Sequence, residues 1–332
     1  MKVAVGLRML SRRKVLVTGL MAGASGVFRR GDVANAAASQ PQTKVSFDVP
    51  PGATDCAVHV FGDTKRHPYW EGRTYTPEPA TVAELRQVMR ALRLDRVVVV
   101  QASTYGTDNS CVLDSMREIG AGARGVAVID DKTTDASLDE MHRGGMRGIR
   151  LSLGNQGVTD LAGARQRLKN AADRMKKRSG WSVLISGSPA TWEALHVDLT
   201  AFTVPIVIDH FGEPRVADGV GQPGFTTVLS LVKSGKAYVK LSNADTVTRQ
   251  PDFSDVTPFA KALIAANPQR VVWGTAWPHP SAGAVTGRKS TDLAVHRQLD
   301  DGRVMNMLTV WAPDAATRKL ILVDNAARLY GF

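Results

Sequence analysis

The sequence contains few cysteines and no long hydrophobic run. Two cysteines in 332 residues are too few for a disulfide scaffold or a cysteine-rich zinc fold. No apolar run reaches the ~18 residues of a membrane-spanning helix, so the sequence predicts no stable membrane anchor. Hydrophobic residues make up 43% and charged residues 22% of the chain, which excludes a disordered or collagen-like protein.

Positive charge is concentrated at the N-terminus. The formal net charge is +11, but residues 1–38 hold seven Lys or Arg residues against one acid, Asp32, and so account for +6 of it. The +5 that remains is modest for so long a chain, and no stripe of basic and aromatic residues accompanies it. The sequence therefore predicts no nucleic-acid partner.

Residues 1–38 have the pattern of an export signal. Ser11-Arg12-Arg13-Lys14-Val15-Leu16 resembles the twin-arginine motif, an apolar stretch continues to Phe28, and small residues allow cleavage near Ala36 or Ala38. We expect a cleavable twin-arginine-type signal peptide, read by the twin-arginine export machinery, and a periplasmic or secreted mature protein. A disordered basic tail is the alternative.

Short apolar runs alternate with helical stretches after a connector at residues 39–52. This alternation predicts a single domain over residues 53–332. Runs that are almost wholly apolar suit parallel strands buried on both faces. The eight predicted strands are Asp55–Phe61, Arg96–Ala102, Gly125–Ile129, Gly148–Leu153, Trp181–Ser186, Pro205–Asp209, Ala237–Ser242 and Arg270–Gly274.

Helix signals lie between these strands. A capping box at Thr81–Glu84 opens a helix to about Leu92, and Ser188-Pro189 opens another. Further helices are predicted from Thr159 to near Ser179-Gly180 and from Pro313 to Val323. Eight strand–helix units favour an α/β fold of the (β/α)8 TIM barrel type. An open doubly wound sheet is the alternative, because the sequence does not show whether the sheet closes.

Polar residues at the predicted strand ends are the candidate site. Function in a (β/α)8 barrel lies at the C-terminal ends of the strands, where His59, Ser103, Arg150 and His210 fall. Arg150 interrupts an apolar strand and needs an anionic partner if it is buried. Two histidines that converge on one mouth suggest a functional pair.

Several short sequence stretches, taken together, resemble those of a known protein family. They are His59-Val60-Phe61-Gly62, His67-Pro68-Tyr69, Arg73-Thr74-Tyr75-Thr76-Pro77, Tyr105-Gly106-Thr107-Asp108-Asn109, Arg147-Gly148-Ile149-Arg150-Leu151, Asp209-His210-Phe211-Gly212, Trp273-Gly274-Thr275, Trp277-Pro278-His279-Pro280 and the tail from Leu322 to Phe332. With these, the chain from Val58 to Phe332 resembles the amidohydrolase superfamily (amidohydrolase-2 type), specifically its 2-pyrone-4,6-dicarboxylate lactonase-like branch.

The resemblance implies a hydrolytic chemistry. In that family a carboxylate after the eighth strand takes a proton from water, which attacks the carbonyl of a cyclic ester. Histidines at the first and sixth strands, here His59 and His210, polarise the carbonyl. Tyr75, Ser103 and Arg150 would hold substrate carboxylates, so the implied partner is a small carboxylated lactone or related anionic ligand.

Two positions at the centre of the implied site depart from the family pattern. The strand-one motif Asp-x-His-x-His reads Asp55-Cys56-Ala57-Val58-His59, so Ala57 stands at the first histidine. The motif Trp-Gly-Thr-Asp-Trp-Pro has Ala276 at the place of the base. Losing a general base typically costs about 10²–10⁴ in rate. We expect no tightly bound cofactor, because only His59 and His210 remain as candidate ligands for a weakly held divalent metal such as zinc.

These departures leave three interpretations open. The protein is a lactone hydrolase that is inactive or strongly impaired with alanine at both positions. Alternatively, it is an exported pseudoenzyme that binds a small carboxylated ligand without turnover. A third, weaker interpretation is that Asp55 or Asp209 has taken over as base.

Overall fold

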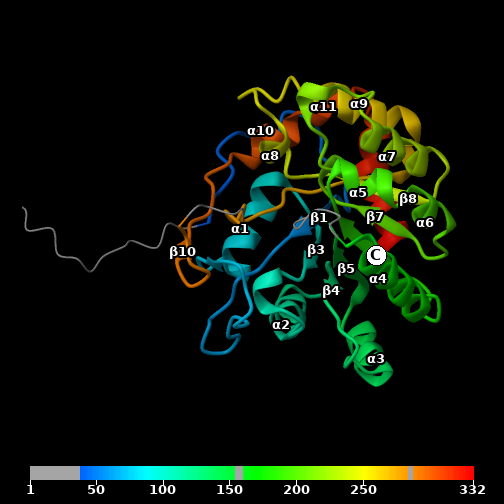
Figure 1. Cartoon of the computed structure of the whole chain (residues 1–332). Helices are drawn as coiled ribbons and strands as arrows, with labels where there is room; N and C mark the ends of the chain where they lie inside the picture. The colour runs from blue at the N-terminus through cyan, green and yellow to red at the C-terminus, as the bar shows by residue number, and fades with distance from the viewer. Residues whose placement is uncertain (1–37, 154–159, 283–286) are drawn as a thin grey trace, which may run out of the picture. The chain divides into compact units, whose positions relative to one another are not determined.

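Eight parallel strands form one sheet in the computed structural model, which describes residues 38–153, 160–282 and 287–332. The strands follow one another around the sheet in chain order, and each pairs with the next (Figure 1). All eight predicted strands are present, and no strand end is shifted by more than three residues. They are β1 (Thr54–Val58), β3 (Arg96–Val100), β4 (Ala123–Ala127), β5 (Met146–Ser152), β6 (Ser182–Ser186), β7 (Ile206–Ile208), β8 (Ala237–Leu241) and β9 (Val271–Trp273).

The first and last strands meet, so the sheet is a nearly closed barrel. A parallel bridge joins Val58 to Trp277, just beyond β9. Two backbone hydrogen bonds reinforce it, from His59 N to Trp277 O and from Ala276 N to Ala57 O, each 2.8 Å long. This contact decides between the two predicted architectures in favour of the (β/α)8 barrel.

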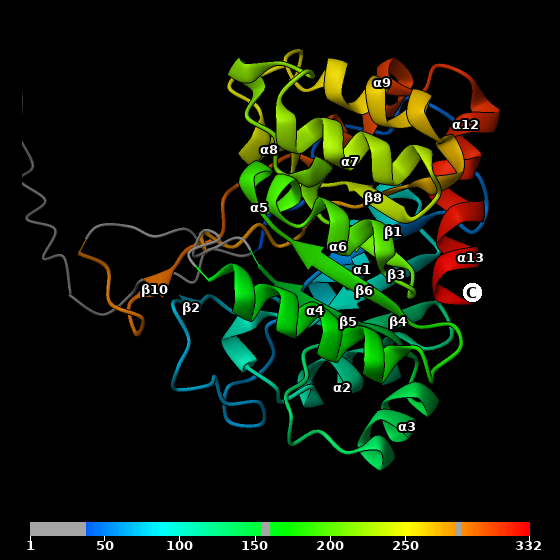
Figure 2. The ribbon, with the colours of Figure 1, turned by 45° about the vertical axis from the view of Figure 1, so that its right-hand side comes forward.

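Helices between the strands cover the outside of the barrel (Figures 1 and 2). Thr81 caps the first of them through the predicted capping box, and Ser188 caps α5 with Pro189 in its first turn. These helices are α1 (Val82–Leu92), α2 (Ser110–Ile119), α3 (Asp135–Arg143), α4 (Leu161–Met175), α5 (Pro189–Ala194), α6 (His196–Ala201), α7 (Pro223–Lys233), α8 (Ala244–Val247) and α9 (Thr257–Ala266).

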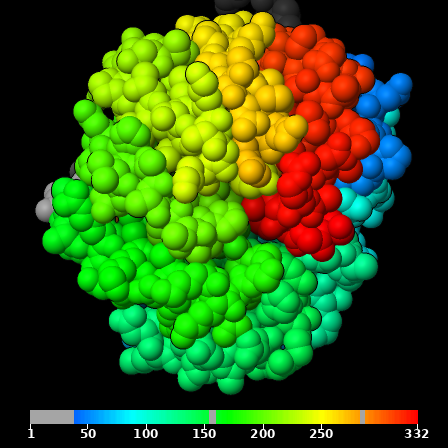
Figure 3. All heavy atoms as spheres, turned by 90° about the vertical axis from the view of Figure 1, so that its right-hand side faces the viewer, coloured from blue at the N-terminus to red at the C-terminus, as the bar shows by residue number. Residues whose placement is uncertain are grey.

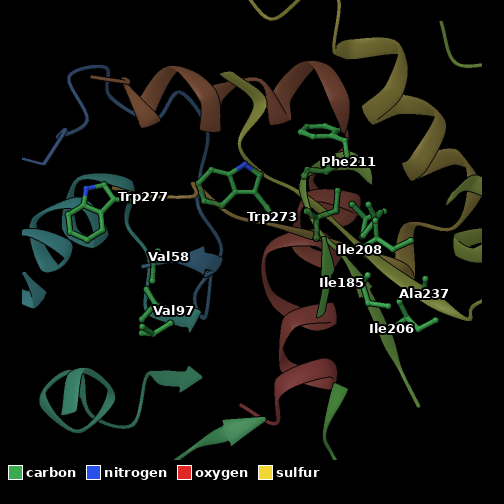
Figure 4. Packing of buried hydrophobic residues seen from close by; sticks show 14 of the residues in the cluster. Val58, Val97, Ile185, Ile206, Ile208, Phe211, Ala237, Trp273 and Trp277 are labelled. Atoms are coloured by element: carbon green, nitrogen blue, oxygen red, sulfur yellow. The ribbon is translucent and has the colours of Figure 1, made fainter. Parts of the chain in front are cut away.

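Apolar residues fill two separate layers. Residues on the outward faces of the strands, with Phe211, Trp273 and Trp277, pack in the layer shown in Figure 4. A smaller cluster contains Cys56, Val98, Leu184 and Val272 together with Leu329 and Tyr330 of the C-terminal helix. Strands buried on both faces explain why the sequence shows uniform apolar runs instead of alternation.

The C-terminal segment extends further than predicted. After α10 (Asp301–Asn306) and α11 (Leu308–Trp311), α12 (Ala315–Lys319) continues through a π-helical stretch (Leu320–Asp324) into α13 (Asn325–Tyr330). The prediction ended this helix at Val323. The helix continues because Ala326, Leu329 and Tyr330 are buried. Its red segment lies to the right of the centre of the face seen in Figure 3.

The helix predicted to begin at Thr159 ends earlier than expected. Thr159 itself lies outside the described residues, and Asp160 caps α4 by accepting a hydrogen bond from Gly163 N. The helix ends at Met175, because the chain then turns and Trp181 leads directly into β6.

Residues 38–52 pack against the barrel. Trp277 Nε1 donates to Ser39 O at 2.9 Å, and Thr43 Oγ1 donates to Asp300 Oδ2 at 2.6 Å. The predicted signal peptide lies outside the described residues, except for Ala38. No helix in the described ranges is long and apolar enough to cross a membrane.

Candidate active site

The mouth of the barrel holds a cavity of about 470 Å³. Two of the sequence-predicted residues, Ser103 after β3 and Arg150 on β5, line it together with Trp70. The loops after β1 and β9 approach each other beside the mouth, since their short strands β2 (Thr76–Pro77) and β10 (Leu293–Ala294) pair in parallel. The cavity is thus built from loops at the C-terminal ends of the strands, where (β/α)8 barrels carry their active sites.

Arg150 connects the predicted site residues electrostatically. Its positive charge lowers the pKa of both His59 and His210 and also acts on Tyr75. Burial raises the pKa of Tyr75, while the charge of Arg150 and the neighbouring Ser103 act in the opposite direction. The structure therefore brings His59, His210, Arg150, Tyr75 and Ser103 to one end of the barrel.

His59 is a neutral imidazole with an accepting nitrogen. Its Nδ1 lies 2.8 Å from the carbonyl oxygen of Val100, so Nδ1 carries the hydrogen and donates it. Burial, aided by the charge of Arg150, lowers the pKa of His59 to about 3. In this tautomer Nε2 is an acceptor, which can hold a water or hydroxyl hydrogen but cannot donate to an oxyanion.

In His210 the two ring nitrogens have the opposite roles, with Nδ1 accepting and Nε2 donating. Its Nδ1 lies 2.9 Å from Ser242 Oγ, and its Nε2 lies 3.9 Å from an oxygen of Asp209. The nearby carboxylate favours a hydrogen on Nε2, with the Ser242 hydroxyl donating to Nδ1. Burial lowers the pKa of His210, so the ring is neutral and Nε2 can donate to a developing oxyanion.

Two buried carboxylates near the mouth already have partners. Burial disfavours the charge of Asp209, but Lys240, with His210 and Arg150, outweighs burial and holds its pKa well below the usual range. Burial raises the pKa of Asp55 to about 7, yet its oxygens accept from Thr275 Oγ1 at 2.6 Å and from two backbone N–H groups. A strongly ionised Asp209 and an immobilised Asp55 are both poor bases.

The two alanine positions adjoin each other where the barrel closes. Ala276 N donates to Ala57 O at 2.8 Å, and both side chains are buried. The β1–β3 register shifts between Asp55 and Val58, so Ala57 lies in an irregular part of its strand. Ala276 has a φ of +67°, in the left-handed region that alanine rarely adopts. Neither methyl group can move a proton or bind a metal.

The residues present do not fit a tight zinc site. Zinc in proteins takes four ligands, of which at least three are side chains even at catalytic sites. Nδ1 of each mouth histidine is already hydrogen-bonded, which leaves one nitrogen on His59 and one on His210. In the described ranges no three His, Cys, Asp or Glu side chains converge in a group that could hold a metal ion.

Three residues of the mouth were not predicted from the sequence. Trp70 is 55% exposed beside the cavity. The positive charge of Arg288 opposes the burial that raises the pKa of Tyr75. Glu213 lies three residues after His210. Glu213 lies five residues after β7 ends at Ile208, and this place in the loop after a strand was the signal that could have identified it. Trp70 and Arg288 lie in long loops, whose fold the sequence pattern does not show.

Comparison with known proteins places these features in a family. The amidohydrolase family model matches residues 54–332. The chain is 35% identical to 4-sulfomuconolactone hydrolase of Hydrogenophaga intermedia (86% of this chain, 90% of the relative) and 33% identical to 2-pyrone-4,6-dicarboxylate hydrolase of Comamonas testosteroni (87% and 93%). The structure of a putative 2-pyrone-4,6-dicarboxylic acid hydrolase from Pseudomonas putida superimposes with a TM-score of 0.70 at 30% identity (85% and 98%).

Proposed function

The chain belongs to the amidohydrolase family, and we propose that its barrel mouth binds a small carboxylated lactone and opens it by water attack only slowly. The named relatives are lactone hydrolases that cover nearly the whole domain. Because Ala57 and Ala276 remove two of the family's reactive groups, turnover is strongly impaired relative to those relatives.

The half-buried side chain of Arg150, whose Nε atom is fully buried, is the observation that carries this proposal. Within the described part of the chain its Nε has no hydrogen-bond acceptor, and its Nη1 has only a long bond of 3.4 Å to Gln101 O. A buried donor without a partner is costly, and a ligand carboxylate would satisfy it through a forked pair of hydrogen bonds. The cavity next to Arg150 is large enough for a small cyclic acid.

The remaining groups take roles set by their hydrogen bonds. Tyr75 and Ser103 bind the ligand's carboxylate beside Arg150. His210 donates from Nε2 to the lactone carbonyl oxygen, and His59 accepts a hydrogen of the attacking water at Nε2. Such preorganised groups stabilise the charge that develops on the carbonyl oxygen.

A pair of chains tests this proposal. The natural chain and its Ala57→His/Ala276→Asp variant are assayed on 2-pyrone-4,6-dicarboxylate and on carboxylated muconolactones, with ligand affinity measured by calorimetry. We expect both chains to bind ligand and the variant to hydrolyse it about 10²–10⁴ times faster. Binding in both chains without hydrolysis in either supports the alternative, a pseudoenzyme that binds a carboxylated ligand. Absence of binding in both contradicts the proposal.

Metal content is measured on the same preparations. We propose that the natural chain works without a tightly bound cofactor, since within the described part of the chain the mouth offers only His59 and His210 as ligands for a divalent ion. Elemental analysis of freshly purified protein should give clearly less than one zinc per chain, and excess zinc should leave lactone affinity unchanged.

We also propose that residues 1–38 direct export through the twin-arginine machinery to the periplasm or the medium. Ser11-Arg12-Arg13 and the alanines near Ala36 and Ala38 support this proposal. Cell fractionation with N-terminal sequencing should find a mature chain that begins near these alanines. An Arg12→Lys/Arg13→Lys variant should remain uncleaved in the cytoplasm, and normal export of that variant would contradict the proposal.

A further inference from the structure

Glu213 is a half-buried carboxylate at the barrel mouth with no assigned role. It lines a second cavity of about 370 Å³, together with Asn243 after β8 and Pro280 after β9. His279, next to Pro280, is hydrogen-bonded through its backbone to Ala276, so this cavity lies on the side of the mouth where the family's base is missing.

The Glu213 carboxylate differs from its neighbours in being unengaged. Asp245 in the same region is paired with Arg297 at 2.8 Å, and Asp209 is paired with Lys240 at 3.3 Å. By contrast, no described side chain or backbone group hydrogen-bonds to the carboxylate of Glu213 or forms an ion pair with it. Its oxygens are therefore available to a ligand or a water molecule.

A strained turn holds Glu213 in place beside His210. Four consecutive residues, from His210 to Glu213, have positive φ angles of 50°, 58°, 80° and 52°. Glu213 N donates to His210 O at 2.7 Å, and Trp192 Nε1 donates to Gly212 O at 2.7 Å. Non-glycine residues in this region cost free energy, and such strain is characteristically kept at functional sites.

The charges around Glu213 suit proton transfer near neutral pH. Burial and the negative charge of Asp209 raise the pKa of Glu213 to about 7, against the opposing charge of Arg150. The other charged or titratable groups around it are His210 on the same turn and the arginines of the second cavity, Arg215, Arg249 and Arg297. A general base is most effective when its pKa lies near the working pH.

The other groups of the mouth are less suited than Glu213 to take a proton from water. His59 has a pKa of about 3, so its Nε2 can hold the water but takes its proton poorly. Asp209 is held ionised by Lys240, and Asp55 is immobilised by Thr275.

We propose that Glu213 is the catalytic base of this chain and replaces the carboxylate that Ala276 lacks, an inference that rests on the lactone hydrolysis proposed above. The Glu213 carboxylate removes a proton from water as the water oxygen forms a bond to the lactone carbonyl carbon. The carbonyl π electrons move to its oxygen, which His210 Nε2–H stabilises. The carbonyl then re-forms, the ring C–O bond breaks, and the departing oxygen takes the proton from Glu213. The net change is addition of one water to the lactone, and Glu213 returns to its ionised form.

The test compares Glu213→Gln with Glu193→Gln in the full chain. Glu193 is an exposed glutamate on α5 and serves as a matched control. The probe is 2-pyrone-4,6-dicarboxylate, with hydrolysis followed by the loss of the pyrone and affinity measured by calorimetry. We expect Glu213→Gln to lower kcat/KM about 100-fold or more while Kd changes less than about threefold. In the natural chain, kcat/KM should rise with pH through about 7, and this rise should be absent from Glu213→Gln.

The outcomes separate this inference from the proposed function. Adding Ala276→Asp to Glu213→Gln should restore hydrolysis, which would show that the variant is folded and binds productively. Unchanged hydrolysis in Glu213→Gln overturns the role of Glu213, and so does a natural chain that binds the pyrone but never hydrolyses it. Binding of the pyrone supports the proposed ligand site whether or not Glu213 is the base. If the pyrone does not bind at all, both proposals fail.

Discussion

Lys240 and Asp209 form an ion pair inside the barrel, with 3.3 Å between Nζ and Oδ1 and both side chains buried. Lys240 comes from β8, and Asp209 follows the neighbouring strand β7. This pair keeps Asp209 ionised and places its second oxygen near His210 Nε2. Ser242, 2.9 Å from His210 Nδ1, orients the ring, and the ion pair leaves no strongly basic carboxylate at this position.

Replacing Lys240 with methionine should destabilise the protein by about 3–5 kcal/mol, because it leaves the charge of Asp209 buried without a partner. Urea unfolding followed by circular dichroism measures the loss. Lys233→Met, at an exposed position near the end of α7, should change stability by less than about 0.5 kcal/mol. Equal stability of the two variants would show that the pair has no structural role.

Replacing Arg150 with methionine should weaken binding of a carboxylated lactone about 10- to 100-fold, because charge-assisted hydrogen bonds contribute about 1.5–3 kcal/mol. Calorimetry on the natural chain and the variant measures the change. Arg165→Met is the matched control, since Arg165 on α4 is exposed and paired with Asp198 at 3.0 Å. A similar loss of affinity in both variants would indicate a general effect of charge instead of a specific contact.

Asp55 should make stability fall as the pH rises from about 4 to 7. Its folded-state pKa of about 7 lies above its ordinary value of 3.8, so between these values the folded protein binds a proton that the unfolded chain has released. The stabilisation is present below pH 4 and is lost as the pH approaches 7. Unfolding measured across this range should show a smaller fall in Asp55→Asn than in the natural chain, and an unchanged fall in the exposed control Asp131→Asn.

The two cysteines should remain unpaired in an oxidising compartment. Cys56 and Cys111 are both buried free thiols, and burial raises the pKa of each. Thiol titration should detect neither in the folded protein and both after denaturation. A reductant should leave Tm unchanged, whereas a lower Tm under reducing conditions would indicate a disulfide.

The strands and their order were accessible from the sequence because local patterns encode them. Runs such as Val97–Val100 and Ile206–Ile208 are apolar on both faces, which is typical of a parallel sheet between two apolar layers. Capping residues such as Thr81 and Ser188 marked helix starts for the same reason, since each satisfies backbone groups within its own turn. Helix ends were predicted less well, because burial of residues such as Leu329 against the barrel decides them.

The sequence by itself determined the alternation of strands and helices, and it put His59, Arg150 and His210 at strand ends and alanine at positions 57 and 276. Only the tertiary structure decided which nitrogen of each histidine is available, which aspartates are already engaged, and that no described residue pairs with the Glu213 carboxylate. Protonation and pairing depend on burial and on neighbours far apart in the chain, and no local pattern of residues encodes those distances.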